Sequence, residues 1–199
     1  MVSNKTVVAV ALLAAVAGAT ASLYFEPAIA LRLARTPVGQ KMLELMGTPP
    51  QVPDGVTVAK PGDAVPPMTL QTTDGAEVVL PDAWAGRPTL VNLWASWCAP
   101  CLKEMPELDA FAREQGANGT QVVGIALDDA VAVSTFLQQH GIGYPNLIDA
   151  PGPADAGVRL GNPFGVLPYT VLVSADGRIL KTRIGPFIDQ ADIAAWARP

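Results

Sequence analysis

Residues 90–108 read LVNLWASWCAPCLKEMPEL, and this stretch decides the fold. Its first part is a short apolar run typical of a buried strand, and after Cys98 apolar residues recur at helical spacing. Cys98 and Cys101 can close a small disulfide ring at the start of that helix. Cys98 would then lie where the helix dipole and free N–H groups stabilise a thiolate. The stretch predicts thiol–disulfide exchange, with Cys98 as the nucleophile and Cys101 as the resolving thiol.

Two other interpretations of the cysteine pair are weaker. A structural zinc site needs four Cys or His ligands, whereas the chain offers three at most, Cys98, Cys101 and His140. A purely structural disulfide would close so short a loop that it would stabilise little. We therefore predict no metal site and no cofactor beyond the redox-active Cys98–Cys101 disulfide.

The remaining sequence predicts a mixed α/β domain. The order is a hairpin, two strand–helix units, a second hairpin and a closing helix, which implies a mixed central sheet with helices on both faces. The expected strands are the hairpin of residues 68–80 around Asp74-Gly75, residues 89–95, residues 121–127, and the hairpin of residues 170–173 and 179–184. The expected helices are residues 98–116, kinked at Pro106, residues 131–140 and residues 189–197.

The N-terminus predicts a membrane span. Residues 6–25 are uncharged and would form a helix of about 30 Å, the thickness of a bilayer core. A cleaved signal peptide is the alternative, because residues 19–21 and 28–30 resemble small-x-small cleavage sites. We favour an anchor, since Tyr24 and Phe25 suit the membrane interface. Residues 1–5 would then be cytoplasmic.

A spacer separates this segment from the soluble domain. Residues 26–61 predict a juxtamembrane helix followed by a proline-rich, semi-rigid linker. The redox domain is expected over residues 62–199. A net charge of −5 without a basic cluster argues against nucleic acid as a partner.

The motifs resemble one known family. The segment of residues 90–108 and GVLPYTVLVSADGRI, residues 165–179, are similar to the TlpA/ResA-like branch of membrane-anchored thioredoxins. The resemblance implies a thioredoxin-like fold and a cis proline opposite the cysteines, matched here by Pro168. It also implies that Leu167 presents its backbone to an extended substrate, and that Trp97, Ala99 and Pro100 complete the substrate-binding surface.

Proton handling is expected to involve Glu104. Thioredoxin carries a buried Asp on the strand before the cysteines, and Asn92 occupies the matching position here. Asn cannot accept the proton that Cys101 loses. Glu104 is three residues past Cys101, so it can share a helix face with it, and the family carries a Glu there. We predict that Glu104 is the acid/base; the alternative is a solvated helix carboxylate.

An export-type N-terminus, a proline-rich spacer and a redox pair together predict a function outside the cytoplasm. We expect a protein-disulfide reductase because Ala99-Pro100 lacks the His that oxidants of this fold use, although an oxidase or isomerase stays open. The expected partners are disulfide-bearing exported proteins, such as apo-cytochrome c or copper-oxidase assembly factors, and an unidentified electron donor. The expected location is the periplasmic side of a bacterial inner membrane, as a monomer.

Two further functions on this fold fit the residues poorly. A peroxidase would need Thr or Ser three residues before its reactive cysteine, and Ala95 occupies that position. A copper-binding assembly module would need a CxxxC pair and a distal His. The cysteines here are closer, and His140 lies at a predicted helix end.

Overall fold

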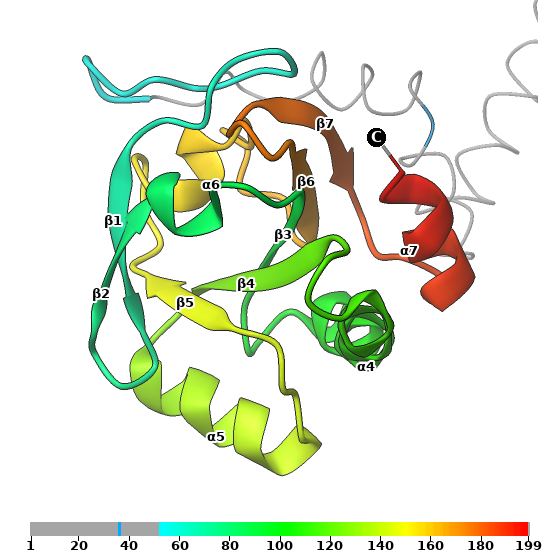
Figure 1. The fold of residues 1–199 in the computed structure, drawn as a ribbon. Helices are drawn as coiled ribbons and strands as arrows, with labels where there is room; N and C mark the ends of the chain where they lie inside the picture. The colour runs from blue at the N-terminus through cyan, green and yellow to red at the C-terminus, as the bar shows by residue number, and fades with distance from the viewer. Residues whose placement is uncertain (1–35, 37–51, 199) are drawn as a thin grey trace, which may run out of the picture. The chain divides into compact units, whose positions relative to one another are not determined.

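A seven-stranded mixed sheet organises the domain (Figure 1). The computed structural model describes Thr36 and residues 52–198. The strand order is β2-β1-β5-β4-β3-β6-β7. The strands are β1 (Met68–Thr72), β2 (Glu77–Leu80), β3 (Thr89–Trp94), β4 (Gln121–Leu127), β5 (Asn146–Asp149), β6 (Tyr169–Val173) and β7 (Ile179–Ile184).

The interior strand β3, between β4 and β6, leads into the cysteines from its C-terminal end. All six of its residues are buried, as its continuous apolar run predicts. It pairs in parallel with β4 and antiparallel with β6. The cysteine helix therefore starts from a fully buried interior strand.

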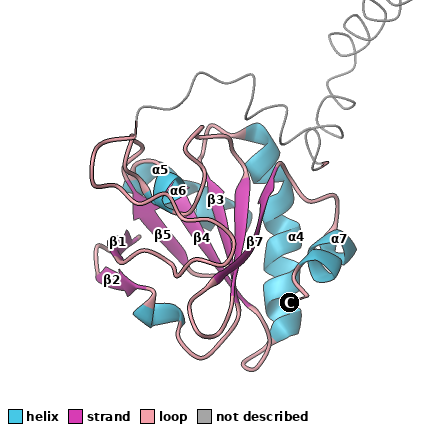
Figure 2. Ribbon diagram, turned by 90° about the horizontal axis from the view of Figure 1, so that it is seen from above, coloured by secondary structure: helices cyan, strands magenta, loops and turns pink. Residues whose placement is uncertain are grey.

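Three helices cover one face of the sheet. Helix α4 (Ala99–Gln115) connects β3 to β4, and α5 (Ala130–His140) connects β4 to β5. Both crossovers step in the same direction across the sheet, so their right-handed connection places both helices on one face. The closing helix α7 (Gln190–Trp196) packs beside α4 (Figure 2). The other face is covered by η1 (Asp82–Trp84) and the short α6 (Ala156–Arg159).

Most of the expected elements are confirmed with small shifts at their ends. Both hairpins form, with Met68 opposite Leu80 in the first and Tyr169 opposite Ile184 in the second. Pro106 lies within α4, which runs without interruption past it. The sequence analysis missed β5, α6 and η1. Each has only three or four residues, so periodicity carries almost no signal, and β5 forms because β1 and β4 flank it.

A missing side chain on β4 makes room for a polar contact behind the cysteines. Trp94 Nε1 donates a hydrogen bond to Asn146 Oδ1 at 2.8 Å. A Cβ atom at Gly124 would overlap that same Asn146 oxygen. Glycine inside a strand marks such a close approach, and here it lets β5 anchor the indole at the end of β3.

The expected membrane span, residues 6–25, and most of the linker lie outside the described residues. Within the part of the chain that the structure describes, no helix is both long and apolar enough to cross a bilayer. The sheet belongs to a compact unit of residues 47–199.

Candidate redox site

The two cysteines form a disulfide at the start of α4. Their Cα atoms are 5.3 Å apart. Cys98 is the N-cap residue, and its carbonyl accepts hydrogen bonds from the N–H groups of Cys101 at 2.9 Å and Leu102 at 3.1 Å. Cys98 is 5% exposed and Cys101 is fully buried. An incoming sulfur atom can therefore approach Cys98 more readily than Cys101.

The residues beside Cys98 face solvent. Trp97 is 69% exposed, Ala99 is exposed, and Pro100 is half-buried at the first turn of α4. These are three of the five residues expected to contact a substrate; the other two are Leu167 and Pro168. Trp94, by contrast, is fully buried in the strand, as predicted from the apolar run.

The Leu167–Pro168 peptide bond is cis, as the family resemblance implies. Pro168 is buried, and its carbonyl accepts a hydrogen bond from Gly185 N–H at 2.9 Å. Leu167 is half-buried and packs against the apolar cluster that contains both cysteines. The loop before β6 and the start of α4 therefore share one apolar environment.

Glu104 is a buried carboxylate, not a solvated one. It is only 2% exposed on the inner face of α4. Its Oε1 accepts a hydrogen bond from Asn92 Nδ2 at 2.9 Å, and its Oε2 accepts one from Phe187 N–H at 2.7 Å. Asn92 Nδ2 also donates to Thr170 Oγ1 at 3.2 Å. A buried carboxylate that accepts two hydrogen bonds, one helical turn beyond Cys101, has the chemistry of an acid/base group for a neighbouring thiol.

Two contributions to the site escaped the sequence analysis. Phe187 N–H reaches Glu104 across 83 residues of chain, and no sequence signal marks this contact. Asp128, at the end of β4, accepts hydrogen bonds from Ser96 N–H at 2.9 Å and Ser96 Oγ at 2.6 Å. A signal for Asp128 did exist, because the carboxyl ends of neighbouring parallel strands meet at one sheet edge.

The Asp128 contact ties down the turn that leads into the cysteines. Partial burial raises the pKa of Asp128, but the hydrogen bonds from the Ser96 hydroxyl, the Ser96 N–H and the Asp129 N–H outweigh it and lower the pKa below its ordinary value. The ionised carboxylate is therefore the form that holds the turn.

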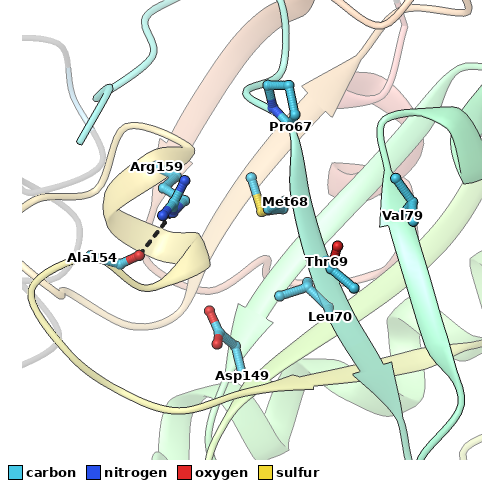
Figure 3. Close-up of a pocket in the computed structure, with 8 residues that line it drawn as sticks. All are labelled: Pro67, Met68, Thr69, Leu70, Val79, Asp149, Ala154 and Arg159. Atoms are coloured by element: carbon cyan, nitrogen blue, oxygen red, sulfur yellow. Dashed lines mark hydrogen bonds between the residues drawn. The ribbon is translucent and has the colours of Figure 1, made fainter. Parts of the chain in front are cut away.

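A separate pocket lies away from these residues (Figure 3). It has a volume of about 430 Å³ and is lined by the β1–β2 hairpin, Asp149 and the α6 region. Burial raises the pKa of Asp149, although its carboxylate accepts hydrogen bonds from the N–H groups of Ala150 and Ala156. None of the predicted site residues lines this pocket.

His140 ends α5, as predicted. Its ring stacks on Phe136 with centroids 4.1 Å apart, and its Nδ1 lies 3.0 Å from the Phe136 carbonyl oxygen. Among the described residues, no three His, Cys, Asp or Glu side chains gather closely enough to hold a metal ion.

The lowered pKa of Asp128 predicts a pH-dependent contribution to stability. A carboxyl group with a lowered folded-state pKa stabilises the fold above its unfolded pKa of about 3.9, and this is lost as the pH falls through the folded value. We expect Asp128→Asn to lower the free energy of unfolding by about 1 kcal/mol at neutral pH, and by less below about pH 4. Urea unfolding measures this, with Ser96→Ala completing a double-mutant cycle. A coupling energy as large in acid as at neutral pH would contradict the assignment.

Comparisons with known proteins match this geometry. The Redoxin family model matches residues 60–196. The thiol-disulfide oxidoreductase ResA of Bacillus thuringiensis (strain Al Hakam) is 28% identical over 127 residues, which cover 62% of this chain and 69% of ResA.

Two solved structures are also similar. A thioredoxin-related protein from Neisseria meningitidis serogroup B is 31% identical, with a TM-score of 0.55 over 63% of this chain and 93% of that chain. A thiol:disulfide interchange protein of the thioredoxin family from Chlorobium tepidum TLS is 25% identical, with a TM-score of 0.58 over 70% of this chain and 95% of that chain. With its CxxC disulfide, its cis proline and its thioredoxin-like sheet, the chain belongs to the Redoxin family, in the ResA/TlpA-like group of thiol–disulfide oxidoreductases.

Proposed function

We propose that this chain reduces disulfides in exported proteins, using Cys98 and Cys101 as a two-electron couple. The observation that carries the proposal is the Cys98–Cys101 disulfide at the start of α4, with the flank of Cys98 exposed and Cys101 buried. Only the outer sulfur of such a pair, that of Cys98, can attack a partner protein or be attacked by one. Trp97, Ala99, Pro100, Leu167 and Pro168 form the surface that receives the substrate in this proposal.

The reduced protein begins the reaction. The Cys98 thiolate attacks one sulfur of the substrate disulfide, a Cys98–substrate bond forms, and the other substrate sulfur leaves as a thiolate. Cys101 then loses its proton and attacks Cys98 Sγ, which releases the second substrate sulfur and forms the Cys98–Cys101 disulfide. Two electrons pass to the substrate, and a dithiol donor must return them by the reverse exchange.

Glu104 accepts the Cys101 proton in this scheme. Its carboxylate is buried and oriented by Asn92 and the Phe187 N–H. The side chains of Glu104, Asn92 and Thr170 form one hydrogen-bonded cluster. Asn92 cannot accept or release a proton, and Glu104 is the one carboxyl group among the three. Because Glu104 is buried, water cannot easily take its place as the acceptor of the Cys101 proton.

The direction of electron flow follows from the dipeptide between the cysteines. Ala99 and Pro100 offer no side-chain donor to stabilise a Cys98 thiolate, so the reduced form gains less than in strongly oxidising relatives of the fold. We expect a reduction potential near or below about −230 mV when the purified full-length chain is equilibrated with glutathione buffers. A value near about −120 mV would reverse the direction and make the chain an oxidant.

The role of Glu104 is tested by Glu104→Gln. We expect the rate of disulfide reduction to fall about 10²-fold, because Cys101 loses its proton acceptor, and we expect the pH profile of thiol reactivity to lose one inflection. Insulin reduction and alkylation rates measure the two effects. Glu114→Gln is the matched control, since Glu114 is an exposed carboxylate on the same helix. An unchanged thiol pH profile in Glu104→Gln would remove Glu104 from the mechanism.

The compartment is part of the proposal. The uncharged run of residues 6–25 would anchor the chain in a bacterial inner membrane with its redox domain on the periplasmic side. Apo-cytochrome c and copper-oxidase assembly factors are the substrates that the family resemblance favours. We expect the native protein to fractionate with membranes and to keep its N-terminus. A mature chain starting at Ser22 or Leu31, found by mass spectrometry, would show a cleaved signal instead.

A further inference from the structure

We infer that Arg183 and Asp192 are positioning residues for the redox site. Their ion pair holds the 186–188 loop so that Phe187 N–H stays on the Glu104 carboxylate, and it thereby sets how tightly Glu104 holds a proton. The inference rests on the acid/base role of Glu104 proposed above. The two residues lie on β7 and α7, outside the cysteine helix, and would influence proton binding by Glu104 from there.

The ion pair is two-pronged and largely shielded from water. Arg183 Nη1 donates to Asp192 Oδ1 at 3.1 Å, and Nη2 donates to Asp192 Oδ2 at 2.8 Å. The Arg183 side chain is 13% exposed and that of Asp192 is 27% exposed. Paired hydrogen bonds between a guanidinium and a carboxylate fix orientation as well as distance, which a single exposed contact does not.

The pair contacts three successive residues of the loop. Arg183 Nη2 donates to the Pro186 carbonyl at 3.3 Å. The guanidinium lies over the Phe187 ring, with Cζ 4.2 Å from its centroid. Asp192 Oδ2 accepts a hydrogen bond from Ile188 N–H at 3.0 Å. The loop is therefore held immediately before, at and after the residue whose N–H reaches Glu104.

The held residue joins the loop to the site. Phe187 N–H donates to Glu104 Oε2 at 2.7 Å, and the Phe187 ring packs in the apolar cluster that contains both cysteines. The Trp196 ring of α7 packs edge-on against the Phe187 ring, with the two centroids 5.5 Å apart. A shift of the loop would move the donor off the carboxylate and disturb the packing beside the cysteines.

The consequence for proton binding follows from the groups around Glu104. Burial favours its neutral acid, whereas a donated N–H favours its carboxylate. Asn92 of β3 faces it with a second donor, and Cys101 lies on the same helix. Tyr144, ahead of β5, lies near enough that burial first, then the charges of Glu104 and Asp109, raise the pKa of its hydroxyl well above the ordinary value. Removing the Phe187 donor tips this balance toward the acid.

The experiment compares Arg183→Met with a matched ion pair elsewhere. Arg178 and Asp176 form an exposed Arg–Asp pair in the β6–β7 turn, with side chains 60% and 70% exposed. The purified, reduced full-length chain is alkylated with iodoacetamide over a range of pH. The inflection of interest is the one that Glu104→Gln is expected to remove from the Cys98 rate profile. We expect Arg183→Met to move it to higher pH by about half a pH unit or more. Arg178→Met should leave the profile unchanged.

Further variants separate positioning from a loss of structure. Asp192→Asn keeps the size of the side chain and should shift the profile in the same direction. Arg183→Lys keeps the positive charge and should shift the profile less than Arg183→Met does. In the Glu104→Gln background, Arg183→Met should have no effect on the profile. Thermal unfolding identifies the pH range in which each variant is folded.

The outcomes distinguish the two proposals. A wild-type profile in both Arg183→Met and Asp192→Asn, with Glu104→Gln still altered, overturns the positioning role and leaves the proposed mechanism intact. An equal shift with and without the Glu104 carboxylate also overturns it, because the pair would then act by another route. An unaltered profile in Glu104→Gln removes the acid/base role and the inference together.

Discussion

The buried Glu104 carboxylate is the constraint around which the site is arranged. Taking a carboxylate out of water is costly unless donors replace the lost hydration. Here the donors come from β3, through Asn92, and from the loop between β7 and α7, through Phe187 N–H. The helix that starts at the cysteines, strand β3 and the loop before α7 are therefore all connected through one side chain.

The surroundings of the cysteines follow from the same packing. Glu104 and Cys101 lie on the inner face of α4, with Met105, Leu108 and Phe111 continuing that face into the core. This burial leaves Cys98 as the sulfur nearest the surface, between exposed Trp97 and Ala99. The site thus places its two cysteines in different environments: Cys98 lies next to the surface, and Cys101 is fully buried on the helix that carries Glu104.

Polar contacts around the site also explain several residues that would otherwise look out of place in a core. Asn146 on β5 binds the buried indole of Trp94, and Gly124 leaves the space for it. Asp128 binds the turn at Ser96. Both contacts lie at the C-terminal end of β3: one binds its last residue, Trp94, and the other binds the turn that follows. The positions of the cysteines therefore depend on β4 and β5 as well as on their own helix.

Much of this could be predicted from the sequence because it is encoded locally. The apolar run of β3, the helical spacing after Cys98 and the turn residues of both hairpins each act over a few residues, so they determine the elements, the redox pair and, with the family resemblance, the cis bond before Pro168. Only the tertiary structure decided the rest. The strand β5 is too short to show a period, Phe187 N–H reaches Glu104 from a distant segment, and the Arg183–Asp192 pair joins β7 to α7. Every residue except proline has a backbone N–H, so the sequence cannot mark the one that binds Glu104. Arg183 and Asp192 become partners only when the sheet and helices assemble.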